Sequence, residues 1–147
     1  MGYDDRDRNA DIAIGTMVTA VVATAIVPAH VNWALTAGAM GTGVIAIGLC
    51  YGVELTKDEA WKLIQQFFAA AGGWFLAMNV GSKFMAAIIQ STGIGYGVAV
   101  ALDATISAAA AYALGEAAKA YFKGERDMGK IGKTFRDSFT NYKKNNN

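Results

Sequence analysis

The sequence predicts an all-α protein, a four-helix membrane-associated bundle whose first two helices form an N-terminal hydrophobic hairpin. Of its 147 residues, 54% are hydrophobic and only 17% are charged. Soluble domains average about 45–50% and about 25% for these two classes, so the composition favours contact with lipid. The chain contains a single proline, which suits long helices because proline breaks a helix interior.

Charge and cysteine content exclude several other classes of protein. The net charge of +1 provides no strongly basic surface for nucleic acid. The single cysteine, Cys50, excludes an internal disulfide. Four aspartates and only two arginines precede the first apolar run, whereas a secretory signal peptide begins with a positively charged region.

We divide the chain into a polar N-terminus (1–10), one helical membrane domain (11–122) and a basic polar tail (123–147). The hairpin occupies residues 11–53, and both of its apolar segments are free of charge. Their lengths are close to the roughly 20 residues that cross a bilayer. A buried hairpin in a soluble bundle is the alternative, but such helices normally carry a polar stripe.

Small residues recur along the second helix of the hairpin. Gly38 and Thr42 lie four residues apart, and Gly48 and Gly52 form a small-xxx-small motif. In lipid, small residues of this kind allow two helix backbones to approach closely. We expect these residues to contact either the first helix or a second copy of the chain.

Two further helices are predicted in the membrane domain. Thr56 and Glu59 form a capping box at the start of an amphipathic helix over residues 57–90. An Ala-rich helix over 97–122 presents a second small-residue face that includes Ala108 and Gly115.

The tail contains one short amphipathic segment with apolar residues at helical spacing, namely Met128, Ile131, Phe135 and Phe139. Eight lysines and arginines lie in residues 116–147, and none lies near the hairpin turn. By the positive-inside rule both termini are cytoplasmic, so two or four spans are expected. We expect the protein in the bacterial inner membrane or in an intracellular membrane.

Candidate chemical sites are few. Asp103 is a lone charge in an apolar stretch, and it is either a functional buried charge or a residue that faces water at a helix end. The triplet Gly132-Lys133-Thr134 lacks the earlier glycine of a phosphate-binding loop. His30 and Cys50 have no partners within sequence reach. We therefore expect no enzyme activity, no cofactor and no metal.

Several short motifs resemble a known family. They are Ile26-Val27-Pro28, Tyr51-Gly52, Gly93-Ile94-Gly95, Ala111-Tyr112-Ala113-Leu114-Gly115 and Tyr121-Phe122. Over residues 9–124 the pattern resembles an uncharacterised bacterial family of helical membrane domains fused to, or encoded beside, Era-like small GTPases, which includes YcjF-type inner-membrane proteins. That family tends to have additional prolines in its turns. The resemblance implies a small GTPase as a possible partner and no established activity.

The function predicted from the sequence is that of a non-enzymatic structural or scaffolding protein embedded in the bilayer. It would form a homo-oligomer through its small-residue helix faces, with a small GTPase as a further partner and no nucleic acid. An oligomeric pore or small-solute conduit lined by Asp103 is one alternative. A soluble helical bundle that forms an assembly or binds an apolar ligand is the other.

Overall fold

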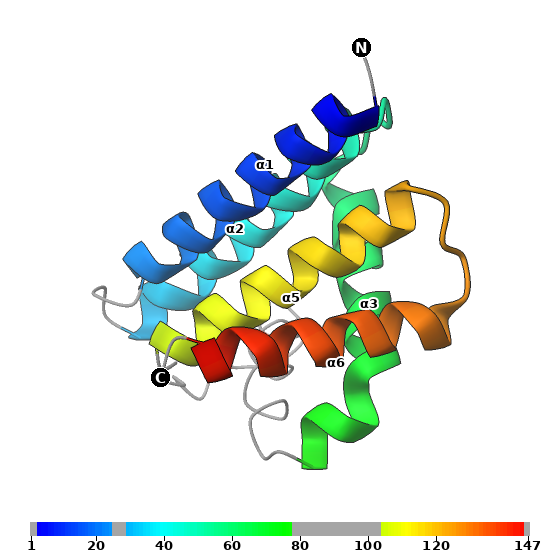
Figure 1. The fold of residues 1–147 in the computed structure, drawn as a ribbon. Coiled ribbons are helices and arrows are strands. Elements are labelled where there is room, and N and C mark those ends of the chain that lie inside the picture. Colours follow the sequence, from blue (N-terminus) through cyan, green and yellow to red (C-terminus); the bar gives the residue numbers. More distant parts are fainter. Residues whose placement is uncertain (1–2, 25–28, 78–103, 146–147) are drawn as a thin grey trace.

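The computed structural model describes residues 3–24, 29–77 and 104–145, with side chains over 5–23, 38–71 and 108–145. These residues form the helices α1 (Tyr3–Thr24), α2 (Ala29–Cys50), α3 (Lys57–Ala77), α5 (Ala104–Phe122) and α6 (Met128–Asn145) (Figure 1). The all-α prediction is confirmed. The predicted number of four helices is wrong, because the tail after Phe122 forms a helix of 18 residues.

Helix α1 begins at Tyr3, nine residues before the first apolar run that we expected to start the helix. Acidic side chains near a helix N-terminus are favourable because they face the positive end of the helix dipole. Asp5 also forms an ion pair with Arg8, three residues along the helix, at 3.2 Å. The polar N-terminus is thus part of the first helix.

Helices α1 and α2 run antiparallel and form the predicted hairpin (Figure 1). The contact is close at Gly43, where an added Cβ would collide with the Met17 side chain. Both helices direct a stripe of buried apolar residues at helical spacing into the core: Ala10, Ile14, Met17 and Val21 from α1, and Met40, Val44 and Ile47 from α2.

Helix α2 ends in a Schellman motif. Gly52 has a positive φ of 76°, a conformation that glycine adopts without the steric penalty of a side chain. The amide of Val53 donates to the carbonyl of Gly48 at 2.9 Å, which closes the motif. We predicted Gly52 as a helix-packing residue, but an added Cβ would contact nothing within 4 Å. Its role in this fold is to stop the helix.

The next helix begins with the capping box that the sequence predicts. The Thr56 amide donates to Glu59 Oε1 at 3.0 Å, and the Glu59 amide donates to Thr56 Oγ1 at 3.2 Å. The backbone hydrogen bond from Thr56 lowers the pKa of the Glu59 carboxyl. The stop signal of α2 and the start signal of α3 therefore fix the connection between them.

Helix α5 contacts each of the other four described helices. Its side chains are small enough for this position, with Ala108 buried together with the three alanines that follow it. At Gly115, an added Cβ would lie 2.7 Å from Ile14 Cγ1. The small-residue face of α5 is thus used inside the fold, where it brings α1 close.

Helix α6 confirms the amphipathic pattern predicted in the tail, with Ile131, Phe135 and Phe139 buried. The ring of Phe135 meets that of Phe68 in α3 edge to face, with centroids 5.0 Å apart. Gly132 lies so near α3 that an added Cβ would be 2.5 Å from the Ala70 carbonyl oxygen. The backbones of α3 and α6 therefore touch at this crossing.

The predicted membrane spans are not supported in the part of the chain that the structure describes. None of its helices combines the length and the apolar character that crossing a bilayer requires.

Replacing Gly132 tests the contact between α3 and α6. Gly132→Ala places a methyl group against a backbone oxygen, so we expect the free energy of unfolding to fall by about 1–3 kcal/mol. The matched control is Gly15→Ala, where the added Cβ meets nothing within 4 Å, and which we expect to stabilise by about 0.5–1 kcal/mol. Urea unfolding followed by circular dichroism measures both, and equal effects would contradict this packing.

Candidate functional site

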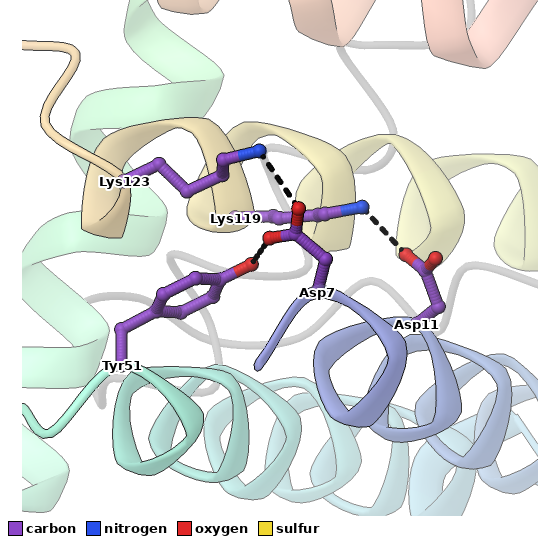
Figure 2. Close-up of polar contacts among 5 residues, drawn as sticks. All are labelled: Asp7, Asp11, Tyr51, Lys119 and Lys123. Atoms are coloured by element: carbon purple, nitrogen blue, oxygen red, sulfur yellow. Dashed lines mark hydrogen bonds and ion pairs between the residues drawn. The ribbon is translucent and has the colours of Figure 1, made fainter. Parts of the chain in front are cut away.

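A cluster of polar side chains joins the N-terminal half of α1 to the C-terminal half of α5 (Figure 2). Lys119 Nζ lies 2.8 Å from Asp11 Oδ1, and Lys123 Nζ lies 3.2 Å from Asp7 Oδ2. Tyr51, just after α2, donates its hydroxyl to Asp7 Oδ1 at 2.6 Å. Because the partners are four residues apart on each antiparallel helix, the two ion pairs lie one turn apart and fix the register of α1 on α5.

The contacts of this cluster shift the pKa of its groups. The hydrogen bond from Tyr51 is the main cause that lowers the pKa of Asp7, and Lys123 adds to it. Burial opposes the charge of Lys119, but the hydrogen bond to Asp11 and the negative charges nearby outweigh burial, so its pKa is raised. Both groups are therefore held in their charged forms at neutral pH.

Glu116 differs from its neighbours because its pKa is raised, chiefly by burial. The carboxylate accepts a hydrogen bond from the Tyr112 hydroxyl. Both side chains line a pocket of about 360 Å³ between α1, α5 and α6, together with Asp11, Ile14, Gly15, Val18, Lys119 and Tyr142.

The polar groups in this region pair with one another and leave no obvious nucleophile and base. Within the described residues no group of three or more possible ligands is placed to hold a metal ion. Cys50 is half-buried, and burial raises the pKa of its thiol, which disfavours the reactive thiolate. Gly132 and its two successors lie within α6, so they form no phosphate-binding loop. The arrangement fits a structural clamp.

Sequence reasoning missed the clamp. The signal that would have found it is the spacing of Asp7 and Asp11, which matches that of Lys119 and Lys123 on an antiparallel helix. Because residues 1–10 were predicted to lie outside the helical domain, no ion pair between Asp7 and Lys123 was expected.

The second candidate feature is a groove of about 510 Å³ on the outer side of the α1–α2 hairpin. Small and hydroxyl-bearing residues of both helices line it, namely Ala13, Thr16, Met17, Ala20, Gly38, Ala39, Thr42, Gly43 and Ala46. Beyond Asp11, the described residues of α1 and α2 carry no charged side chain. The outer face of the hairpin is therefore uncharged from Ile12 to the end of α1 and along the described side chains of α2.

Two exposed threonines on α1 are less polar than their residue type suggests. Thr16 Oγ1 donates to the Ile12 carbonyl and Thr19 Oγ1 to the Gly15 carbonyl, both at 2.9 Å. Thr16 lines the groove and Thr19 does not. Since the Thr16 donor is satisfied within the helix, covering this side chain with an apolar surface costs little. Ile12 and Leu49 are exposed by 61% and 55%, so each helix of the hairpin also exposes a large apolar side chain.

The structure separates the predicted packing residues into two groups. Gly38 and Thr42 line the outer groove. Gly48 and Gly115 are buried inside the fold, where an added Cβ at Gly48 would lie 3.1 Å from the Val53 carbonyl oxygen. Ala108 is also part of the buried interior. Asp103 lies outside the described residues.

Comparison with known proteins identifies the family but not the activity. The sequence matches the family described as domain of unknown function (DUF697) over residues 4–144. This chain belongs to that family. The match covers all the described helices almost completely, so the DUF697 unit includes α6 and its packing against α3. Neither a curated protein nor a solved structure matches the chain.

Removing the Tyr51 hydroxyl tests the clamp directly. In Tyr51→Phe we expect the pKa of Asp7 to rise toward its ordinary value, because its largest favourable contact is lost. Lys123→Met is the matched control and should raise this pKa by less. NMR titration of the Asp7 carboxyl carbon measures both. If Lys123→Met has the larger effect, the hydrogen bond from Tyr51 is not the dominant contact.

Glu116→Gln tests the half-buried carboxyl. Since the folded state raises the pKa of Glu116, its ionised form opposes folding above that pKa, and this penalty vanishes below the unfolded value of about 4.3. Glu116→Gln should therefore have a higher Tm than the parent protein at neutral pH, and the difference should disappear as the pH approaches about 4.3. Thermal unfolding across this pH range measures it, and a constant difference would contradict the assignment.

Proposed function

We propose that this DUF697 domain is a non-enzymatic scaffolding module that associates with a membrane and assembles with copies of itself through the outer face of α1 and α2. The observation that carries this proposal is the open, uncharged groove between the two helices. Exposed apolar patches of appreciable size on a protein surface mark sites of interaction. The hydroxyl donor of Thr16 is satisfied within the helix, and the other lining side chains are mostly small, so burying this face against another surface has a low free-energy cost.

The shape of the face favours a second copy as the occupant of the groove. The contact between Gly43 and Met17 sets the antiparallel register, and Leu49 follows the lining residue Ala46 by three positions, at one end of the groove. Gly38 lies at the other end, where an added Cβ meets nothing within 4 Å. In this proposal, the exposed Leu49 side chain forms an apolar ridge at one end of the face, and the space at Gly38 forms a hollow at the other.

A ridge and a hollow on one face are self-complementary under two-fold symmetry. If two copies face each other across a two-fold axis through the groove, the ridge of each copy lies on the hollow of its partner. Interfaces of this isologous kind are the commonest among homo-oligomers. The packing of apolar side chains into a small-residue hollow also works in lipid, where there is little hydrophobic drive between helices.

Charge placed in the groove tests the assembly. Gly38→Glu adds bulk and an unpaired carboxylate to the hollow, so we expect the mass in mild detergent to fall to that of a single chain. Gly15→Glu is the matched control. It also replaces an exposed glycine by glutamate, but on the side of α1 that faces away from the groove, so it should leave the mass unchanged. Light scattering after gel filtration measures these masses.

A second variant tests the two-fold arrangement itself. Leu49→Lys alone should also dissociate the assembly, but the double variant Gly38→Glu, Leu49→Lys pairs opposite charges at both symmetric contacts and should recover it. Recovery in the double variant supports the ridge-on-hollow contact. A single-chain mass for the parent protein, or no loss of mass in Gly38→Glu, would overturn the proposal of self-association.

The membrane part of the proposal has its own test. The expressed protein should be found in the membrane fraction of cells, and recovery of the full amount in the supernatant without detergent would contradict it. The resemblance to proteins associated with Era-like GTPases makes a small GTPase a further proposed partner, and titration with such a GTPase in its two nucleotide states would test this binding.

The alternative of an apolar ligand is favoured by the size of the groove. Its volume of about 510 Å³ lies within the range of about 300–1,000 Å³ that is usual for small-molecule sites. A ligand would leave the protein at single-chain mass. Its binding would be lost in Gly38→Glu, and the double variant with Leu49→Lys would not restore it.

A further inference from the structure

Helix α1 is exposed on two sides. One side lines the groove with α2, and the other lies next to the C-terminal turn of α6. Tyr142 of α6 lines the same pocket as Gly15 and Val18 of α1, so the end of α6 is adjacent to the uncharged part of α1. Gly15, Thr19 and Val22 are exposed on this side of α1. We call the surface formed by these three residues with Tyr142, Lys143 and Lys144 the α1–α6 edge.

Helix α6 carries much of the positive charge of the described structure. It contains Lys130, Lys133, Arg136, Lys143 and Lys144 against the single acid Asp137. Lys133 is paired with Asp137 at 2.9 Å. At the other end, the Lys143 ammonium lies 5.9 Å from the centre of the Phe139 ring, and Lys144 is exposed. The cationic end of α6 is therefore the end that meets α1.

We propose that the α1–α6 edge binds the surface of an anionic phospholipid bilayer, a proposal that rests on the membrane association proposed above and names the lipid class. The edge combines an uncharged helix side, a tyrosine and a pair of lysines. The bilayer interface accommodates the same combination, since apolar side chains enter the acyl boundary, tyrosine lies at the headgroups and lysine reaches the anionic surface.

The chemistry of the edge favours lipid over other acidic partners. Nucleic-acid binding relies on many phosphate contacts from a strongly basic surface, whereas the chain has a net charge of only +1. The lysines of the edge also lie beside an uncharged side of α1, where the Thr19 hydroxyl is satisfied within the helix. A nucleic-acid backbone would make no favourable contact with this uncharged side. A bilayer uses both halves of the surface.

Vesicle flotation of the full chain tests this proposal. The two vesicle types are phosphatidylcholine alone and equal parts of phosphatidylcholine and phosphatidylglycerol. We expect stronger binding to the anionic vesicles, and we expect the double variant Lys143→Gln, Lys144→Gln to weaken that binding by about 30-fold. The matched control, Lys130→Gln with Lys133→Gln, removes the same charge from the other end of α6 and should weaken it far less.

The outcomes separate this proposal from the one on which it rests. Equal binding to both vesicle types, or equal losses in the two double variants, overturns the anionic-lipid edge and leaves membrane association intact. Binding to neither vesicle type overturns both the edge and the membrane part of the proposed function. Binding to a phosphate-rich oligonucleotide in preference to anionic vesicles also overturns the edge. Thermal unfolding of each variant, followed by circular dichroism, checks that the fold is unchanged.

Discussion

Helix α5 contacts each of the other four described helices, and it has room for them because its buried side chains are small. At Gly115 the contact with α1 is close, since an added Cβ would lie 2.7 Å from Ile14. A larger side chain there would push α1 outward. The register that places Asp7 opposite Lys123 and Asp11 opposite Lys119 would then be lost. The polar clamp thus depends on a glycine contact within the core.

Helix α1 packs against α2 and α5. Its accessible surface is therefore limited to the side that faces outward and the strips on either side of it. The clamp uses the charged residues of its N-terminal half, whereas the described residues from Ile12 onward carry no charge. One flank of this uncharged part forms the groove with α2, and the other adjoins the end of α6. The same helix therefore offers two surfaces of different character.

Local signals in the sequence predicted the elements of this fold well. The helical hairpin, the capping box of Thr56 and Glu59 and the amphipathic helix through Ile131 and Phe135 follow from short-range spacing, and the structure has all three. The roles of the glycines did not follow from spacing. Gly38, Gly48, Gly52 and Gly115 all belong to small-residue patterns, yet one lines an open groove, two are buried and one stops a helix. Which glycine meets a neighbour depends on tertiary contacts. The expected membrane spans rested on the length of the two apolar segments and on their lack of charge and of a polar stripe.

The two proposed surfaces can act at the same time because they lie on different flanks of α1. If the two-fold axis of a dimer lies along the bilayer normal, symmetry gives the α1–α6 edges of both copies the same height and the same tilt relative to the bilayer. Two weak lipid contacts held together in this way bind more tightly than either contact alone, since the second contact forms at a high effective concentration. Assembly through the groove would then raise the affinity for a bilayer without changing the proposed preference for anionic lipid, which we attribute to Lys143 and Lys144. A scaffold built in this manner would bind membranes as an assembly and release them when its copies separate.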